Sequence, residues 1–332
     1  MHGNASRQTV PMDLSIASIT TAHNAAHVLP RQLTALLGQT RPLQEIIVVD
    51  NGSSDGTGQL LAEHFPQIKT LAMAQNLGAA GAWRTGLEYA ALQRRHDWVL
   101  AFDDDSVPGE DALEKLLAAA DSAAAADHES DGRHRNHFET GMIAMLPVHA
   151  KTGACYPPLL WREGFCRPTA EKLRQPVWFA DLAIASGLMV RRELVESIGL
   201  PRADFFMDFF DFEYCLRARA RGYRIAVVTE AKLAHEIGEA RAVRLPGFSA
   251  LWPNHAPWRE YYMSRNLAYA VWWLYPSRRA KRFALRHLAR HAAGVLLFGN
   301  DKLACLARSM QGFLDGRRAR LGVRFRPEQV RA

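Results

Sequence analysis

The sequence lacks any apolar run that could cross a bilayer. Of its 332 residues, 48% are hydrophobic, but the longest candidate runs, 267–275 and 292–298, fall short of the roughly 18 residues that a spanning helix needs. The first 13 residues lack the charged start, apolar centre and small-residue cleavage site of a secretory signal. We therefore expect a cytosolic chain without a membrane span.

Cysteine is also scarce. The four cysteines are scattered and form no C-x-x-C pair, so the sequence predicts neither a disulfide framework nor a zinc knuckle. Two nucleotide-binding signatures are missing as well, the G-x-x-x-x-G-K-[ST] P-loop and the G-x-G-x-x-G dinucleotide fingerprint. A nucleotide could bind this chain only through a motif other than these two.

Positive charge is concentrated at one end of the chain. Residues 257–332 carry a net charge of +12, whereas residues 1–256 carry −5. A basic segment of this kind is attracted to an anionic surface, such as lipid head groups, nucleic acid or an acidic glycan. We predict an N-terminal tail over 1–13, a catalytic domain over 14–256, and a basic helical extension over 257–332.

Short strands alternate with helices from residue 14 onwards. Helical stretches at 25–38, 56–65 and 78–94 separate β-rich runs at 14–20, 45–50, 68–72 and 98–105. This rhythm predicts an α/β fold with an open, mostly parallel, twisted sheet flanked by helices. Further along, the pattern predicts strands at 142–148, 182–190 and 225–229 and a helix at 211–223. Ligands of such sheets bind at the carboxyl ends of the strands, where Asp50 and Asp103–Asp105 fall.

Three adjacent carboxylates, Asp103 to Asp105, end one of the predicted strands. Adjacent carboxylates repel one another unless a cation or hydrogen-bond donors offset their charge. In an extended chain Asp103 and Asp105 point the same way, so one oxygen from each could hold Mg²⁺ or Mn²⁺. The alternative is an acidic turn that caps the following helix, and this motif alone leaves both interpretations open.

Two turns rich in glycine follow earlier strands. VVDNGSSDGTG at 48–58 puts Asp50 at the tip of a strand, although its residues are also typical of a tight turn with an N-cap. Asn76 and Gly78 begin a second loop that leads into a helix. Backbone N–H groups and the helix dipole could meet a diphosphate there.

Five motifs together resemble the family-2, GT-A type inverting glycosyltransferases, and within them the rhamnosyltransferase and galactofuranosyltransferase branch. The motifs are VVDNGSSDGTG, NLGAAGAWRTG, DDDS at 103–106, FFMDFFDFEYCLRARARGY at 205–223 and HEIG at 235–238. The resemblance covers about residues 14–240. It implies a GT-A fold and transfer of rhamnose or galactofuranose from a nucleotide-diphospho-sugar to a glycan or polyprenyl-linked acceptor, by a metal-dependent inverting single displacement.

The resemblance also implies which residues form the donor site. Mn²⁺ or Mg²⁺ would be held by Asp103, Asp105 and His235. The nucleotide-sugar would be bound by Thr20, Asn24, Asp50, Asn76, Gly78, Arg84, Asp104, Ser186 and Gly187.

The catalytic base implied by the resemblance lies in the stretch MDFFDFEYC. Asp211 matches the family's base position, Asp208 is a rival for that role, and Glu213 could contact the sugar. Helix chemistry offers other roles, since Asp211 could cap the helix and Glu213 could stabilise its dipole as a first-turn carboxylate.

The basic extension contains two candidate contact sites. Arg265, in WREYYMSRN, could bind an acceptor phosphate or form a structural ion pair. Trp272, Trp273 and Tyr275 lie beside a basic run at 278–282, a pattern that predicts peripheral contact with the inner face of an anionic membrane. The alternative is a solvated basic face over a packed aromatic core. Contact with a second copy of the chain is a further option.

Three other classes of protein compete with a glycosyltransferase. A nucleic-acid-binding protein would explain the basic tail but not the acidic cluster, and no recognition motif for nucleic acid is present. A nucleotidyltransferase would also use paired aspartates, but the basic glycine-rich loop expected near its first strand is absent. An inert sugar-binding relative would not need to retain Asp103, Asp105, Asp211 and His235.

Overall fold

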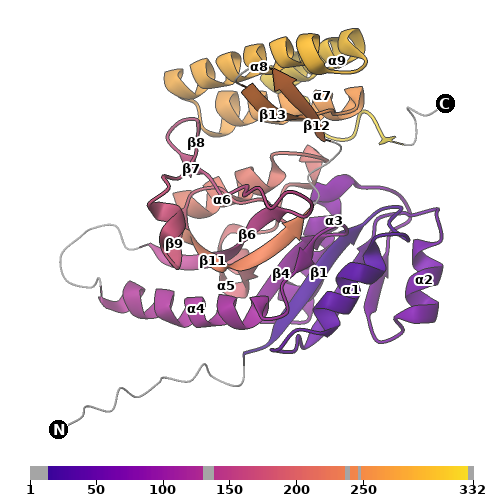
Figure 1. Cartoon of the computed structure of the whole chain (residues 1–332), viewed down its shortest axis with the longest axis vertical. Helices are drawn as coiled ribbons and strands as arrows, with labels where there is room; N and C mark the ends of the chain where they lie inside the picture. The colour runs from indigo at the N-terminus through magenta and orange to yellow at the C-terminus, as the bar shows by residue number, and fades with distance from the viewer. Residues whose placement is uncertain (1–13, 130–137, 236–239, 246–247, 328–332) are drawn as a thin grey trace.

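The computed structural model describes residues 14–129, 138–235, 240–245 and 248–327. The predicted tail, residues 1–13, lies outside these ranges, as do Glu236, Ile237 and Gly238 of the last motif. A large twisted sheet with helices on both faces forms the body of the molecule, and three C-terminal helices pack at one end of it (Figure 1). The predicted α/β class is confirmed.

The first half of the sheet is parallel. Its order is β3-β2-β1-β4, made by β1 (Ile16–Ala22), β2 (Glu45–Asp50), β3 (Lys69–Ala72) and β4 (Trp98–Asp103). The connecting helices are α1 (Leu29–Leu37), α2 (Thr57–His64) and α3 (Gly78–Leu87), the last continued by a π-helical turn, η1 (Glu88–Gln93). These elements match the predicted alternation of strands and helices.

The second half of the sheet is mixed. β10 (Leu188–Arg191) runs antiparallel between β4 and β6 (Glu139–His149), and β6 pairs in parallel with β11 (Tyr223–His235). β11 also takes two short antiparallel partners, β5 (Val107–Pro108) and β9 (Val177–Ala180). The strand predicted over 182–190 forms only over Leu188–Arg191, because Gly187 has φ 76° and turns the chain immediately before it.

Alternating side chains of the strands feed two hydrophobic cores. In β4, Val99 and Ala101 face one core, whereas Trp98, Leu100 and Phe102 face the other. The first core is completed by α3, α5 (Arg192–Ile198) and α6 (Phe210–Ala220), and the second by α1, α2 and α4 (Ala112–Glu129). Strands buried on both faces read as apolar runs, which is why the sequence pattern located them.

The C-terminal extension is a helical unit. Its helices are α7 (Pro257–Tyr269), continued by a π-helical turn, η4 (Ala270–Leu274), then α8 (Arg278–Phe298) and α9 (Lys302–Arg317). A hairpin of β12 (Ala240–Leu245) and β13 (Phe248–Pro253) precedes them. Two short pieces, β7 (Leu160–Trp161) and β8 (Phe165–Cys166), pair beneath α8. In the described part of the chain, no helix combines the length and apolar character needed to cross a bilayer.

Glycines allow α9 to lie against the backbone of α7. A Cβ atom on Gly312 would lie 2.1 Å from the carbonyl oxygen of Tyr261, and one on Gly316 would lie 2.2 Å from that of Arg265. Any larger residue at either position would push the helices apart. α9 therefore fixes α7 in place.

Candidate functional site

Acidic side chains meet at the carboxyl edge of the parallel strands. Register pairs Ala22 at the end of β1 with Asp50 at the end of β2, and Thr21 with Asp103 at the end of β4. β11 ends at His235, close to the loop that follows β4. The sheet therefore brings residues from four strands to one place, as the rule for open α/β sheets predicts.

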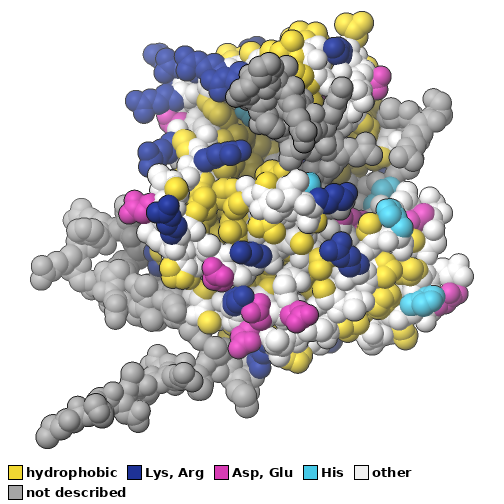
Figure 2. Space-filling view, in the orientation of Figure 1, with side chains coloured by type: hydrophobic (Ala, Val, Ile, Leu, Met, Phe, Trp, Pro, Cys, Tyr) yellow, Lys and Arg dark blue, Asp and Glu magenta, His cyan; other side chains and the backbone are white. Residues whose placement is uncertain are grey.

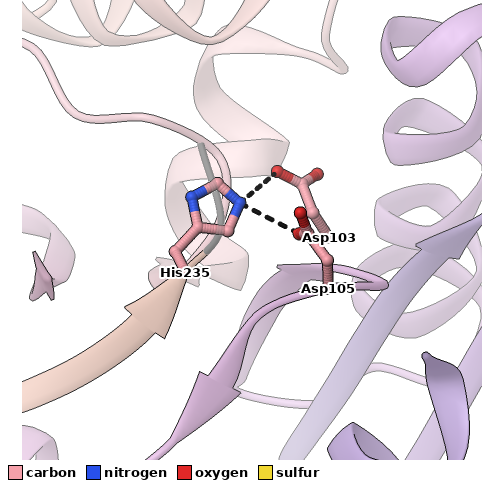
Figure 3. A group of neighbouring side chains, drawn as sticks. All are labelled: Asp103, Asp105 and His235. Carbon is pink, nitrogen blue, oxygen red and sulfur yellow. Dashed lines mark ion pairs between the residues drawn. The ribbon is translucent and has the colours of Figure 1, made fainter. Parts of the chain in front are cut away.

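Asp103, Asp105 and His235 form a compact cluster at this edge. The imidazole Nε2 lies 3.1 Å from Asp105 Oδ1 and 3.5 Å from Asp103 Oδ2, and both carboxylates point toward it (Figure 3). One ligand atom from each residue falls within 4.8 Å of the others. Ligands held at about 2.1 Å around an octahedral ion lie about 3 Å apart. Two carboxylate oxygens and one imidazole nitrogen therefore fit Mn²⁺ or Mg²⁺ in both spacing and chemistry.

The charge state of His235 depends on these carboxylates. Burial by itself would lower the pKa of His235, but hydrogen bonds and negative charge from Asp103 and Asp105 outweigh it and raise this pKa to about 10. Without a metal ion the imidazole is thus a cation that balances the acidic pair. Among the described residues, no group hydrogen-bonds to the buried Nδ1 of His235.

Asp104 faces the opposite way, toward the end of β1. Its Oδ2 accepts a hydrogen bond from the backbone N–H of His23 at 3.2 Å. Burial raises the pKa of Asp104 to about 7, and the neighbouring charges of Asp103 and Asp105 add to the effect. A carboxyl group so readily protonated can donate as well as accept a hydrogen bond at neutral pH.

A polar network ties the predicted nucleotide-binding loops together. Asn51 donates to Asn76 Oδ1 at 3.1 Å and accepts from the N–H of Leu77 at 2.8 Å, and Asn76 Oδ1 accepts from the N–H of Gly78 at 2.8 Å. Asp50 accepts from the N–H of Ser53 at 3.0 Å. These bonds hold the loops after β2 and β3 side by side.

The loop after β1 is fixed in the same way. Asn24, at φ 54°, donates its N–H to Ser53 Oγ at 2.9 Å and accepts from the N–H of Ser54 at 2.8 Å. Thr20, in contrast, is fully buried inside β1. Arg84 donates to the carbonyl oxygen of Pro201 at 3.2 Å, which gives its guanidinium a structural contact.

Ser186 supports the backbone of the acidic loop. Its hydroxyl accepts from the N–H of Asp103 at 3.2 Å and donates to Ser106 Oγ at 2.8 Å, and Ser106 in turn donates to the carbonyl oxygen of Asp103 at 2.7 Å. Gln32 donates to the same carbonyl oxygen. Gly187 donates its N–H to Ala101 at 2.8 Å. Ser186 and Gly187 thus support the end of β4, where the acidic loop begins.

Asp211 lies in the first turn of α6, but it does not cap the helix. The helix begins at Phe210, and the N-cap position is taken by Phe209 in a left-handed conformation, φ 65°. Asp211 accepts from the N–H groups of Ala185 at 3.3 Å and Phe212 at 2.8 Å. Burial raises the pKa of Asp211 to about 7, with further contributions from the charges of Asp208 and Asp103. Because Asp211 bonds to the N–H of Ala185, it lies next to Ser186, which supports the acidic loop.

The two other candidate acids are already paired. Asp208 faces Arg259, with Nη2 2.8 Å from Oδ1 and Nε 3.0 Å from Oδ2. Glu213 is buried and forms a similar two-bond pair with Arg217, at 2.9 and 3.0 Å. Of the three candidates, only Asp211 has no ion pair among the described residues.

The loop before Asp211 is strained and is held from the C-terminal extension. Phe206, Asp208 and Phe209 have φ values of 62°, 59° and 65°, a region that side chains with a Cβ atom seldom adopt. Asn266 Nδ2 donates to the carbonyl oxygens of Phe205, Met207 and Asp208, at 3.0, 2.6 and 2.8 Å. These bonds offset the strain and fix the position of the loop.

Arg265 takes part in the same restraint. It is fully buried, and its Nη2 donates to the carbonyl oxygens of Asp204 and Phe205 at 3.1 and 2.7 Å. Arg265 thus has a structural role, but its partners are backbone carbonyl groups and not the acidic side chain of the expected ion pair. A guanidinium in this position offers no surface to an acceptor phosphate.

The aromatic run after Arg265 divides between interior and surface. Trp272 packs edge-on against Phe313, and the Tyr275 hydroxyl donates to the carbonyl oxygen of Glu213 at 3.5 Å. Trp273 alone of the three is mainly exposed, at 55%. Two of the three predicted interfacial aromatics are therefore packed inside, Trp272 within the extension and Tyr275 against α6.

Residues that the sequence analysis did not select complete the site. Asn51 and Ser106 lie inside the recognised motifs, next to Asp50 and Asp105, so those motifs could have identified them as site residues. Arg259 belongs to the same WREYYMSRN stretch as Arg265. Arg326 donates to the carbonyl oxygen of Asn76 at 2.7 Å, and nothing in its sequence surroundings marked it.

Comparison with known proteins gives consistent matches. The family model Glycosyl transferase family 2 matches residues 18–164. The dTDP-rhamnosyl transferase RfbF of Shigella flexneri is 26% identical over 224 residues, which are 67% of this chain and 68% of that protein. The galactofuranosyltransferase GlfT1 of Mycobacterium tuberculosis is 26% identical over 273 residues, 78% of this chain and 83% of that protein.

A solved structure shares the fold. The crystal structure of GalNAc-T7 with UDP, GalNAc and Mn²⁺ aligns with a TM-score of 0.59 at 16% sequence identity, over 92% of this chain and 56% of that one. The predicted GT-A fold is confirmed. The family match over residues 18–164, the two relatives and the shared fold agree with one another, and they make the chain similar to the family-2 glycosyltransferases.

Proposed function

We propose that the chain transfers a sugar from a nucleotide-diphospho-sugar to a hydroxyl group of a glycan or polyprenyl-linked acceptor, with inversion at the anomeric carbon. The convergence of Asp103, Asp105 and His235 on one point, at the sheet edge that also carries Asp211, is the observation that carries the proposal. Rhamnose and galactofuranose are the proposed sugars, because related proteins are named for their transfer.

The donor would bind along the carboxyl edge of the parallel strands. Asp50 and Asn24 would contact the nucleoside, and the N–H groups at Gly78 and the start of α3 would face the diphosphate. Asp103, Asp105 and His235 would hold Mn²⁺ or Mg²⁺, which as a Lewis acid would stabilise the departing diphosphate. Asp104 would bind the ribose or sugar through its readily protonated carboxyl group.

Asp211 would accept the proton of the attacking hydroxyl group. Its raised pKa, about 7, is near the value at which a general base is most effective in neutral solution. Asp208 is occupied by Arg259 and Glu213 by Arg217, so neither has a free carboxylate for this task. No covalent sugar–enzyme bond is required, because one displacement gives inversion.

The extension would also place the enzyme on an anionic membrane. Leu303, Met310 and Leu314 form an exposed stripe on α9, and Leu296 and Leu297 are exposed at the end of α8. Figure 2 shows hydrophobic side chains at one end of these helices and Lys and Arg at the other. Apolar residues that can insert between lipids, together with basic residues at the other end of the same helices that attract anionic head groups, suit a peripheral contact.

A panel of nucleotide-diphospho-sugars tests the proposed reaction. With Mn²⁺ or Mg²⁺ we expect one donor to be hydrolysed slowly and to be transferred when an acceptor is supplied. Asp105→Ala should lose metal-dependent donor binding, because a single carboxylate and an imidazole remain. The proposal fails if no donor binds with either metal, or if chelation with EDTA leaves turnover unchanged.

A further inference from the structure

Arg259 is a cation of the active site that belongs to the C-terminal extension. It is the third residue of α7, and its side chain reaches Asp208, three residues before the proposed base Asp211. Most other polar residues of the site come from the sheet and from the loops that follow its strands, whereas Asp211 lies in α6 and Arg326 also belongs to the extension. The extension therefore contributes a charged group next to the site as well as restraining the loop with Arg265 and Asn266.

Only part of the Arg259 guanidinium is used by the ion pair. Nε and Nη2 donate to the two oxygens of Asp208 at 3.0 and 2.8 Å. Nη1 makes no hydrogen bond with any described residue, and the side chain remains 37% exposed. A guanidinium has five N–H donors in a rigid plane, so the Nη1 side can bind a second anion while Asp208 keeps its hold.

We propose that Nη1 of Arg259 binds a phosphoryl oxygen of a ligand in the active site. The inference rests on the proposed function, which puts two such groups within reach: the diphosphate of the donor and a phosphate that links an acceptor to its lipid. Arginine suits this task better than lysine, because its planar fork can serve Asp208 and a phosphate at once. Phosphate binding was one of the two roles expected for Arg265, which is buried; the open side of Arg259 is where the structure can accommodate a phosphate.

The charges around Arg259 support this assignment. Asp208 acts on the guanidinium most strongly and raises the pKa of Arg259 despite its burial, and Asp103 and Asp211 contribute as well. The guanidinium is thus within electrostatic reach of both the metal-ligand pair and the base. A phosphate entering this acidic surrounding needs a positive partner in addition to a metal ion.

Calorimetric binding of two probes to the full chain tests the proposal. The first probe is a nucleoside diphosphate with Mn²⁺, and the second is farnesyl phosphate added to the protein saturated with that nucleotide. Arg259→Ala should weaken one of them about tenfold or more, as expected for loss of a charge-assisted hydrogen bond. A loss confined to the first probe identifies the donor as the source of the phosphoryl group, and a loss confined to the second identifies the acceptor.

Two further variants separate ligand binding from mere support of Asp208. Asp208→Asn removes the carboxylate charge but keeps the guanidinium, so it should preserve or strengthen binding of the probe that Arg259→Ala loses. Arg95→Ala, at an exposed arginine paired with Glu196, should change neither probe. Equal losses in Arg259→Ala and Asp208→Asn, or none in folded Arg259→Ala, overturn the inference. If the unmodified chain binds no nucleoside diphosphate, the proposed function fails as well.

Discussion

At the scale of single residues, the site works by keeping acids in different states. Asp103 and Asp105 lie beside an imidazole that balances them, Asp208 and Glu213 are held by arginines, and Asp211 is left with backbone donors alone. Burial therefore raises the pKa of Asp211, and among the described residues no ion pair to a positive side chain offsets it. Asp211 thus has a pKa suited to the proposed base at neutral pH, although all these carboxyl groups have similar intrinsic chemistry.

The raised pKa of Asp211 predicts a pH-dependent transfer rate. The base works only when deprotonated, so kcat should fall as pH decreases through about 7 and level off above it. Transfer measured from pH 5.5 to 8.5 at saturating donor and metal gives this profile. An unchanged rate down to pH 5.5 would rule out Asp211 as the titrating base.

Asp211→Asn should separate binding from chemistry. We expect transfer to fall about 10²–10⁴-fold, the usual contribution of a general base, while metal-dependent donor binding persists. The variant should also unfold at a higher temperature at pH 8. Because the folded state raises the pKa of Asp211 to about 7, the free energy of unfolding falls as pH rises from the ordinary pKa of an aspartate to about 7 and levels off above it; asparagine avoids this cost. Normal transfer by Asp211→Asn would move the base assignment to Asp208.

At the scale of elements, α7 is a brace for the loop 205–209, which precedes the proposed base Asp211. Arg265 and Asn266 replace the hydrogen bonds that the strained loop 205–209 does not make with itself. The same loop also packs against Gly78, in the loop proposed to bind the donor. The contact is so close that a Cβ atom on Gly78 would lie 2.1 Å from the carbonyl oxygen of Phe206. Movement of α7 would therefore disturb both the base and the donor loop.

Asn266→Ala tests this brace. It removes three bonds from one amide, and the part-buried carbonyl groups of Met207 and Asp208 lose this donor while that of Phe205 keeps Arg265, so we expect the free energy of unfolding to fall by about 1–3 kcal/mol. Below the melting temperature, kcat should fall more than the affinity for donor, because the base shifts while the metal ligands stay. Asn254→Ala, which removes an exposed bond to Asn300, serves as the control. Equal kinetics in both variants would contradict a positioning role for α7.

The elements also show what the sequence could and could not predict. Strands buried on both faces read as apolar runs, so the parallel half of the sheet and the place of Asp50 and Asp103 followed directly. The partnership of His235 with Asp103 and Asp105 came only from the resemblance, because no spacing rule links residues so distant in the chain. Arg259 and Arg265 are six positions apart, about 240° around a helix, and no local pattern tells which of them faces the interior.

At the scale of the whole molecule, the N-terminal and C-terminal parts of the chain differ in net charge and in exposed hydrophobic side chains. Residues 1–256 carry a small negative net charge, whereas residues 257–332 carry the basic excess and most of the exposed large hydrophobic side chains of the described residues. Deleting the extension would not test its contact with lipid cleanly. α9 packs on α7, with Tyr261 bonded to Asp315 at 2.9 Å, so truncation after Tyr275 would expose α7 and release the base loop.

Substitutions on the exposed stripe give a cleaner test of membrane contact. The double variant Leu303→Asp and Met310→Asp puts two negative charges on a surface that is 83% and 60% exposed at these side chains, so folding should be unaffected. Its partition onto vesicles of equal phosphatidylglycerol and phosphatidylcholine should drop about tenfold or more, since it loses apolar burial and gains repulsion from anionic lipid. Binding of the unmodified chain should weaken with salt, and Leu37→Asp, at an exposed leucine on α1, should leave it intact. The proposal is wrong if no variant binds vesicles and the double variant converts an oligomer to a monomer. In that case a second copy of the chain covers this surface. The net positive charge of each extension must then be balanced across the interface.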